Sequence, residues 1–439
     1  MDVEQRSQVI QLKKVINQKW EESFEMARSF SISKQVVWQA YKRVKANKGA
    51  AGVDEQTIED FERNLKGNLY KIWNRMTSGS YYPPAVKAVA IPKKSGGMRI
   101  LGIPSVSDRI AQTVVKLYIE PEMDKCFHPD SYGYRPGKSA IQAVAITRRR
   151  CWKYGWLLEY DIKGAFDNID HELLIKALKR HTESDWILLY IKRWLEAPMK
   201  QPDGTITERT VGTPQGGVIS PLLMNLFLHY VFDKWMVSHH PDLPFARYAD
   251  DGVIHCRTLY EAERLKEELE KRFKECKLEL HPQKSKIVCC KADKPWISYP
   301  VTKFDFLGYE FRLRTSRTRQ GRLFASFQPA ISPTAAKAIR REMRSWRISC
   351  RSDKSIQDLS RMFSPIIMGW INYYGHFYKS AMYPTMYNFN RKLVKWVTKK
   401  YKRFRRRPRR AHYWLGRIAH KEPWLFPHWK EFGLKPSVG

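Results

Sequence analysis

The sequence lacks the cysteine patterns that build disulfide frameworks or structural zinc sites. Its 439 residues include only seven cysteines, an odd number, and no two of them have Cys-x-x-Cys spacing. We therefore expect scattered reduced thiols, as in a cytosolic protein. The first 14 residues contain no apolar core segment, and no run of 18 apolar residues occurs anywhere in the sequence. Neither a signal peptide nor a membrane-spanning helix is expected.

Acidic residues are also scarce. The chain has 44 Asp plus Glu against 79 Lys plus Arg, a formal net charge of +35. This excess repels itself in a compact fold unless a polyanion neutralises it, and nucleic acid is the obvious polyanion because phosphate contacts release counterions. A membrane surface is the alternative partner. However, the basic residues alternate with Trp and Tyr over a long region and not along one short amphipathic helix.

The length predicts about three structural units, and a hydrophobic content of 43% is enough for sizeable cores. Residues 1–80 are predicted to be an N-terminal helical extension, with Trp38, Tyr41 and Val44 at three-residue steps. Residues 81–325 mix strand and helix patterns. In residues 326–439 the chain becomes strongly basic and mainly helical.

Several strands are predicted in the middle region. Val86–Ile91 and Met98–Ile103 flank turn residues and form a hairpin with a basic tip, while Trp156–Ile162 is an apolar strand carrying Asp161 at its end. The alternation in Phe304–Phe311 predicts one further strand. A long amphipathic helix is expected to hold Leu265, Leu269, Phe273 and Leu280 on one side.

The last 109 residues, from position 331, differ in composition from the rest. They contain 25 Lys plus Arg, 5 Asp plus Glu and 19 of the 57 aromatic residues, and nine of the twelve residues in Lys399–Arg410 are basic. Basic and aromatic residues together suit RNA, because cations meet phosphates and rings stack on unpaired bases. Two plainer interpretations stay open: a solvated basic run, and a helix core formed by the aromatic stripe Trp370, Tyr373, Tyr374, Phe377 and Tyr378.

Three acids are the best candidates for chemistry. Asp161 ends one apolar strand, and Asp250 and Asp251 lie at a predicted hairpin about 90 residues later. If the two strands are neighbours, their carboxylates can hold two divalent cations that clamp the attacking and leaving oxygens of a phosphoryl transfer. Magnesium suits such oxygen ligands. By spacing alone, an exposed Asp-Asp turn without chemistry remains the alternative.

Ordered blocks of sequence carry a family resemblance from about residue 35 to 430. They are Asn47–Asp54, Ile91–Arg99 with Leu101–Pro104, Tyr160–Asp167, Gly212–Pro221, Tyr248–Asp251, His281–Lys286, Phe306–Tyr309 and Gly369–Tyr374. Together they resemble the reverse transcriptases encoded by group II introns. Tyr248-Ala249-Asp250-Asp251 is similar to the signature of reverse transcriptases in general, and the Pro-Gln-Gly of the Gly212–Pro221 block is similar to the group II intron type.

The resemblance implies roles for the acids. Asp161 and Asp250 would ligate two Mg²⁺ ions, with Mn²⁺ as a substitute, and the main-chain carbonyl of Ile162 would be a further metal ligand. Asp251 would complete the catalytic aspartates by shaping the site. No side-chain general base is needed, because a metal ion can itself lower the pKa of the primer 3′-hydroxyl.

The resemblance also implies the nucleotide contacts. Lys93 and Arg99 would grip the triphosphate of the incoming nucleotide, and Lys284 would contact primer-end or nucleotide phosphates. Phe166 would lie beneath the ribose and exclude a 2′-hydroxyl, and Gln215 would lie near the nascent base pair or the template. The alternatives are a solvated hairpin tip for Lys93 and Arg99 and a position in the core for Phe166. For Gln215 the alternative is a plain turn residue, and for Lys284 a solvated side chain.

The implied fold is an α+β right-hand polymerase. Fingers and palm with an antiparallel sheet occupy 81–325, and a mainly helical thumb or maturase domain occupies 326–439. The implied function is RNA-directed DNA synthesis by a protein that binds structured intron RNA, assists its splicing and copies it into target DNA from dNTPs. RNA contacts are assigned to Lys399, Lys400, Lys402, Arg403, Arg405, Arg406, Arg407, Arg409 and Arg410.

The chain shows no His-Asn-His endonuclease region or cysteine pairs after the basic region, so it resembles endonuclease-less lineages, which use a 3′ end already present at the target. A cytoplasmic bacterial protein that joins the nucleoid when acting on DNA is implied. The oligomeric state stays open. Two other functions are considered: a non-catalytic splicing cofactor, and a reverse transcriptase repurposed for defence or diversity generation.

Overall fold

A computed structural model describes residues 30–92, 97–291, 299–317 and 320–433. The chain forms two compact units, each assembled from several segments. Unit 1 comprises the described residues up to Gly137, with Ile162–Pro241 and Glu268–His281. Unit 2 comprises Lys138–Asp161, Asp242–Glu267 and the described residues from Pro282 onward. The chain therefore passes from one unit to the other immediately after Asp161.

Unit 1 is mainly helical, and its helices begin where the sequence supplies capping residues. Thr57 and Asp60 form a capping box, and the Ser105 hydroxyl accepts the Asp108 N–H. The long helix α5 packs against α2 and α4. The helical elements are α2 (Lys34–Asn47), α3 (Ile58–Glu62), α4 (Leu65–Thr77), α5 (Val106–Cys126), η1 (Ala165–Asp167), α7 (His171–Leu178), α8 (Asp185–Glu196), α9 (Ser220–Leu228), η2 (His229–Asp233) and α10 (Lys234–His239).

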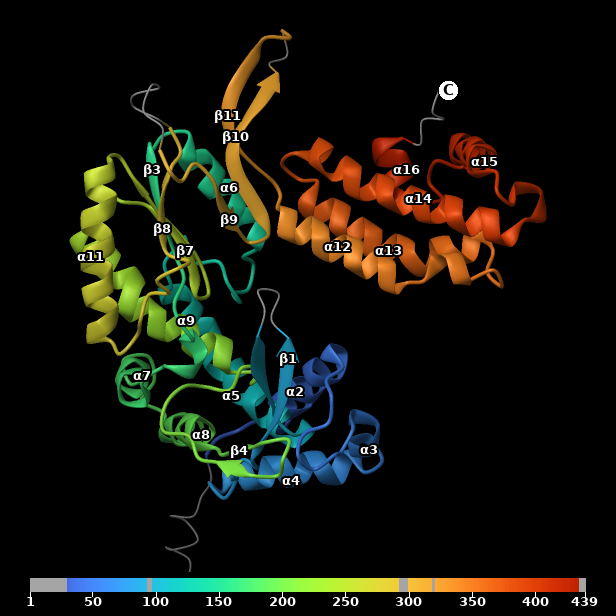
Figure 1. Cartoon of the computed structure of the whole chain (residues 1–439). Coiled ribbons are helices and arrows are strands. Elements are labelled where there is room, and N and C mark those ends of the chain that lie inside the picture. Colours follow the sequence, from blue (N-terminus) through green and yellow to red (C-terminus); the bar gives the residue numbers. More distant parts are fainter. Residues whose placement is uncertain (1–29, 93–96, 292–298, 318–319, 434–439) are drawn as a thin grey trace, which may run out of the picture. The chain divides into compact units, whose positions relative to one another are not determined.

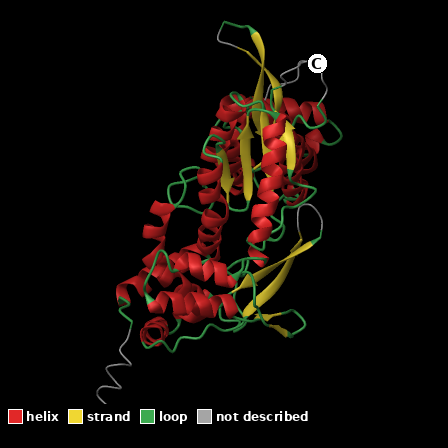
Figure 2. Ribbon diagram, turned by 90° about the vertical axis from the view of Figure 1, so that its left-hand side faces the viewer, coloured by secondary structure: helices red, strands yellow, loops and turns green. Residues whose placement is uncertain are grey.

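The sheet of unit 1 is built on the predicted hairpin. The strands β1 (Val86–Pro92) and β2 (Met98–Ile103) are antiparallel and form a long ribbon (Figure 2). The short strands β4 (Met199–Lys200) and β5 (Ile206–Thr207) extend it in the order β2-β1-β4-β5. The predicted basic tip, which includes Lys93, lies outside the described residues.

Unit 2 contains a four-stranded antiparallel sheet in the order β6-β7-β3-β8 (Figure 1). Its strands are β3 (Trp156–Tyr160), β6 (Phe245–Tyr248), β7 (Asp251–Cys256) and β8 (Lys286–Cys289), and α6 (Ala140–Cys151) packs against β6 and β7. Four of the five β3 residues are buried, as expected of an apolar central strand. The predicted α+β class with an antiparallel palm sheet is confirmed.

The single strand predicted for Phe304–Phe311 is wrong. The segment instead forms a hairpin between β9 (Phe304–Phe306) and β10 (Tyr309–Arg317), and β10 also pairs with β11 (Leu323–Ile331). Leu307 and Gly308 turn the chain with φ of 52° and 79°. Positive φ at both positions defines a type I′ hairpin loop, and glycine adopts this conformation freely whereas leucine rarely does. The apolar Leu307 therefore concealed the turn.

The predicted amphipathic helix is α11 (Leu259–Glu275), which buries Leu265, Leu269 and Phe273. Leu280 does not belong to it. The helix ends five residues earlier, and within unit 1 Leu280 forms an isolated antiparallel bridge with Ile162. A buried leucine can satisfy helical spacing by coincidence, because burial after a helix ends still selects an apolar residue.

The C-terminal region of unit 2 is mainly helical, as predicted. It contains α12 (Pro333–Ser345), η3 (Ile348–Cys350), α13 (Ile356–Tyr374), η4 (Lys379–Met382), α14 (Tyr383–Lys400), η5 (Lys402–Phe404), α15 (Pro408–Lys421) and α16 (Pro427–Phe432). Trp346 anchors its core by stacking on Phe363 and Trp370, with ring centroids 4.3 and 5.4 Å away. Across the described residues no helix has the length and apolar character needed to span a membrane.

The aromatic stripe divides between core and edge. Trp370 and Tyr374 are partly buried against the helical core, which favours the plainer interpretation for these rings. Phe377 and Tyr378 are not on the helix, because α13 ends at Tyr374. The hydroxyl of Tyr373 donates to the carbonyl of Leu307 at 2.8 Å. The stripe therefore also fastens the β9–β10 turn.

Two glycines should respond to alanine in opposite directions. Gly308→Ala should lower the free energy of unfolding by about 1–2 kcal/mol, because its φ is left-handed. Gly369→Ala should raise it by up to about 1 kcal/mol, because Gly369 lies inside α13 with open space around a new Cβ. Shifts of the urea midpoint measure both. Shifts of the same sign would contradict the turn geometry.

Candidate active site

Asp250 and Asp251 lie at the turn between β6 and β7. Tyr248 pairs with Asp251, so Ala249 and Asp250 form a two-residue turn, with Ala249 buried at a φ of 56°. The Nη1 of the fully buried Arg247 donates to the carbonyl oxygen of Ala249 at 3.1 Å. This contact holds the turn and fixes where the Asp250 side chain begins. Sequence reasoning missed the role of Arg247, although a basic residue within an apolar strand was a signal.

Asp161 reaches the same end of the sheet from β3. Tyr160 pairs with Gly252 of β7, so continuing the register brings Asp161 opposite Asp251. A Cβ on Gly252 would come within 2.2 Å of the Tyr160 ring, so glycine permits this close approach. The strand pairing therefore gathers the three predicted aspartates in unit 2.

Two residues of the His281–Lys286 block contact Asp161. The Nζ of Lys284 lies 2.7 Å from Oδ2 of Asp161, and the Ser285 hydroxyl accepts the Asp161 N–H at 3.3 Å. Lys284 was predicted to contact phosphates, and here its partner is a carboxylate. Ser285 was missed, because a buried serine after a lysine carries no signal until β8 is placed beside β3.

The negative charge of the three carboxylates exceeds the positive charge beside them. Burial raises the pKa of Asp250, and repulsion by Asp161 adds to the rise while a backbone hydrogen bond, Lys284 and Arg247 oppose it. Asp251 keeps an exposed edge, yet the surrounding protein, then Asp250 and Asp161, raise its pKa to about 7. Both shifts mean that the ionised state is disfavoured unless further positive charge is supplied.

Glu159 extends this negative region along β3. Its side chain lies on the same face as Asp161, two residues away, and its Oε2 is 3.2 Å from Nζ of Lys286. Burial raises the pKa of Glu159 to about 7, with repulsion from Asp305 and Asp251 adding to the rise against the opposing effect of Lys286. Glu159 was also missed, although an acid in an apolar strand was the available signal.

In unit 1, the structure brings Phe166 and Gln215 onto neighbouring segments. The carbonyl oxygen of Phe166 accepts the Thr213 N–H at 2.7 Å, and the Gln215 side-chain amide donates to both carboxylate oxygens of Asp167 at 3.1 and 3.2 Å. A Cβ on Gly212 would come within 2.6 Å of the Asp167 carbonyl oxygen. The Pro-Gln-Gly block is therefore pressed against the segment that carries the half-buried Phe166.

The same block is fastened to the β1–β2 hairpin. The Gly102 N–H donates to the Gln215 carbonyl at 2.8 Å, and Gly216, with a φ of 125°, packs so closely on Gly102 that a Cβ would meet its oxygen at 2.5 Å. Arg99 is exposed on β2, opposite Ile91. Unit 1 thus links Arg99, Phe166 and Gln215 through backbone contacts. Ile162, buried in this unit, follows Asp161 in the chain.

A buried polar network supports the Pro-Gln-Gly block. Gln112 Oε1 accepts the Val218 N–H at 2.8 Å, and its Nε2 donates to Asp108 at 2.9 Å. Asp108 also accepts from Tyr81 at 3.0 Å and Trp194 at 2.7 Å. Burial raises the Asp108 pKa to about 6, against these hydrogen bonds. Sequence reasoning missed this network because its members are far apart in the chain.

The predicted RNA-binding run is ordered in the structure, across the end of α14, η5 and the start of α15. Lys400 is half-buried, because its Nζ donates to the carbonyls of Ser352 and Lys354 at 2.8 and 2.6 Å. The other eight are exposed: Lys399, Lys402, Arg403, Arg405, Arg406, Arg407, Arg409 and Arg410. Eight cations are therefore open to a ligand, whereas Lys400 caps neighbouring backbone.

Comparison with known protein families shows which family the chain matches. Residues 91–311, half of the chain, match the family model described as reverse transcriptase (RNA-dependent DNA polymerase). The chain belongs to the reverse transcriptase family. Residues 336–414, in the basic C-terminal region, match the maturase-specific domain of group II introns. The predicted resemblance to reverse transcriptases encoded by group II introns is confirmed.

Individual relatives agree with the family assignment. Group II intron-encoded protein LtrA of Lactococcus lactis subsp. cremoris is 33% identical over 221 residues, which cover 50% of this chain and 36% of LtrA. The match thus spans about a third of that relative's length. Protein YkfC of Escherichia coli (strain K12) is 29% identical over 342 residues, covering 69% of this chain and 86% of YkfC. A telomerase structure from Candida albicans aligns with a TM-score of 0.43 and 13% identity, covering 87% of this chain and 69% of that chain.

Gln215 and Asp167 should be functionally coupled. Gln215→Ala and Asp167→Ala should each raise the apparent KM for a dNTP by a similar factor, because either change removes the same side-chain hydrogen bonds. The double variant should be no worse than either single variant, since interacting residues are not additive. Steady-state primer extension at varied dNTP measures this. Independent, multiplying effects would exclude the coupling.

Proposed function

We propose that the protein is a magnesium-dependent RNA-directed DNA polymerase in which Asp161 and Asp250 hold two metal ions. The observation that carries this proposal is the pairing of β3 with β7, which sets Asp161 beside the Asp250–Asp251 turn. Burial, and then repulsion among these carboxylates, raises the pKa of Asp250 and Asp251. Divalent cations would supply the missing positive charge, and hard oxygen ligands suit Mg²⁺.

Asp161 and Asp250 are the two side chains proposed as metal ligands. Among the residues that the structure describes, no group of three or more His, Cys, Asp and Glu side chains is arranged to enclose a metal. Magnesium bound by two carboxylates would keep its other positions for water and substrate phosphates. The Ile162 carbonyl would add a ligand, and Asp251 would contribute negative charge. Bound ions would stabilise charge on the reacting phosphate and activate the 3′-hydroxyl.

The nucleotide contacts belong to the same proposal. Arg99 and Lys93 would bind triphosphate oxygens, and Lys284 would exchange its carboxylate partner for a phosphate. Phe166 would exclude a ribose 2′-hydroxyl, while Gln215, held by Asp167, would lie near the nascent base pair. The fastening of the Pro-Gln-Gly block to Gly102 supports a fixed position for Gln215.

The wider role that we propose is that of a group II intron maturase and retrohoming enzyme, acting in the bacterial cytoplasm and at the nucleoid. It would bind its structured intron RNA, assist splicing and copy the RNA into target DNA. The maturase-specific match and the name of the LtrA relative support this role. In this proposal 1–80 is the N-terminal extension, 81–325 the fingers and palm, and 326–439 the thumb and maturase domain.

Primer extension tests the polymerase. With a DNA primer on an RNA template, Asp250→Ala should lower the rate by roughly 100-fold or more, because a metal ligand that stabilises transition-state charge is lost. Omission of Mg²⁺ should abolish extension. Asp353→Ala, which removes an exposed carboxylate from a turn before α13, is the matched control. If the wild-type protein binds structured RNA but never extends a primer, the polymerase proposal is wrong and the non-catalytic splicing cofactor remains.

Phe166 gives a second, independent readout. Phe166→Ala should increase incorporation of ribonucleotides relative to deoxyribonucleotides by at least about tenfold, since the lost ring no longer excludes the 2′-hydroxyl. Single-nucleotide incorporation of matched rNTP and dNTP gives the ratio. Phe166→Tyr, which keeps the ring, should retain the wild-type ratio. An unchanged ratio in Phe166→Ala would assign the ring to the core.

A further inference from the structure

Helix α14 carries a row of exposed residues at every fourth position. The row consists of Tyr383, Tyr387, Arg391, Lys395 and Lys399, all of them exposed. Residues four apart are neighbours on a helix, and such a row is inclined to the axis, so it crosses the exposed face diagonally. At 1.5 Å per residue the row extends over about 24 Å. We call these five residues the α14 row.

The α14 row is not part of the hydrophobic core. The opposite side of the helix fills that role, with Met386, Phe389, Leu393, Trp396 and Val397 buried. The hydrophobic core of the C-terminal helical region therefore does not include the α14 row. Packing in that core does not explain why tyrosines occupy the two exposed positions.

The two tyrosines form an ordered aromatic step on the surface. Tyr383 and Tyr387 are 46% and 43% exposed, and their rings are nearly parallel, with centroids 6.1 Å apart and an interplanar angle of 16°. Trp370, in contrast, stacks on Trp346 against the core. Exposed, parallel rings at a fixed spacing offer flat faces to unpaired bases, which stack on aromatic side chains.

The stretch of sequence that contains the α14 row carries charge of one sign. No Asp or Glu occurs in the 63 residues from Leu359 to Lys421. Within the described part of the chain, Arg391, Lys395 and Lys399 form no ion pair. Burial and then repulsion by Arg344 and Lys395 lower the pKa of Lys392, which lies beside the row. Cations crowded without an acid attract a polyanion.

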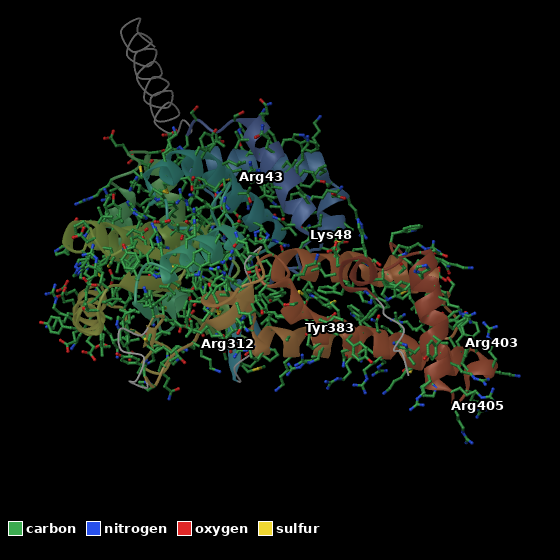
Figure 3. The ribbon with its side chains drawn as sticks, turned by 90° about the horizontal axis from the view of Figure 1, so that it is seen from above. Arg43, Lys48, Arg312, Tyr383, Arg403 and Arg405 are labelled. Atoms are coloured by element: carbon green, nitrogen blue, oxygen red, sulfur yellow. The ribbon has the colours of Figure 1, made fainter. Side chains whose placement is uncertain are left out.

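We propose that the α14 row binds single-stranded RNA, with two unpaired bases stacked on Tyr383 and Tyr387 and the following phosphates on Arg391, Lys395 and Lys399. Lys399 also begins the basic run that continues to Arg403 and Arg405, which Figure 3 labels at the opposite end of this helical body from Tyr383. The row and the run thus form one continuous track. This proposal rests on the proposed RNA binding but not on polymerase activity.

A single strand fits the row better than a duplex or an acidic protein. Bases in a duplex are stacked within the helix and offer no free face to a tyrosine, so a duplex would use only the cations. An acidic protein would pair with the cations and leave the parallel rings unexplained. The combination of exposed rings followed by cations is the arrangement typical of single-strand binding.

Equilibrium binding tests the proposal. Fluorescence anisotropy would be measured with the full chain, a single-stranded oligoribonucleotide of about 16 nucleotides and an RNA duplex of equal length. Tyr383→Ala with Tyr387→Ala should weaken single-strand binding by roughly 10- to 100-fold and duplex binding by less than about threefold. Tyr383→Phe with Tyr387→Phe should bind as wild type, because the stacking faces remain.

The cations should appear in the salt dependence. Replacing Arg391, Lys395 and Lys399 by Gln should reduce the slope of log affinity against log salt by about 2, since each phosphate contact to a single strand contributes about 0.7. The matched control replaces three exposed cations on or next to helix α11 by Gln, namely Arg257, Lys271 and Lys274. Its slope should stay near the wild-type value.

One further variant makes the result decisive. Tyr260→Ala removes a ring that is 72% exposed on α11, outside the C-terminal helical region, and should leave binding unchanged. Binding is measured without dNTPs, so the result does not depend on polymerase activity. Equal losses for single strand and duplex after tyrosine removal, or equal losses in Tyr260→Ala, would overturn the assignment of Tyr383 and Tyr387 as a stacking site.

Discussion

Mutual repulsion of carboxylates is the constraint on which the active-site half of the molecule depends. Asp161, Asp250 and Asp251 would separate if their strands were free, and the pairing of β3 with β7 prevents this. The pairing in turn needs Gly252 beneath the Tyr160 ring and Arg247 beneath the Ala249 carbonyl. The free energy gained by burying the apolar strands therefore keeps these carboxylates together, although Lys284 offsets their charge only in part.

The C-terminal helical region, from α12 to α16, carries the opposite charge, and its charges also repel one another. Its core is complete with Trp346, Phe363 and Trp396 inside, while its surface from Leu359 to Lys421 carries no acid to balance the cations. In the proposed function each place has a ligand of opposite charge that would offset the repulsion: metal ions for the carboxylates, phosphates for the basic helices. The excess of +35 is thus organised by region and not spread evenly.

Sequence patterns predicted the elements that carry these charges but not the contacts that hold them. Apolar strands that end on acids gave Asp161 and the Asp250 turn, because burial and strand ends leave local signals. The roles of Arg247, Ser285 and Gln112 depend on partners that other segments supply. The hairpin at Leu307 was concealed for a different reason: a leucine occupies a backbone conformation that normally selects glycine.

The aromatic residues show how far composition can be taken. Their abundance in the last quarter of the chain is compatible with both a core and a stacking surface, and the structure divides them. Trp370 and Tyr374 lie on the side of α13 that faces the core, whereas Tyr383 and Tyr387 lie on the side of α14 that does not. Helical phase decides the difference, and phase is known only once each helix has a boundary and a neighbour. Because α14 begins at Tyr383, its exposed row starts with rings and ends with cations, an order that composition alone could not reveal.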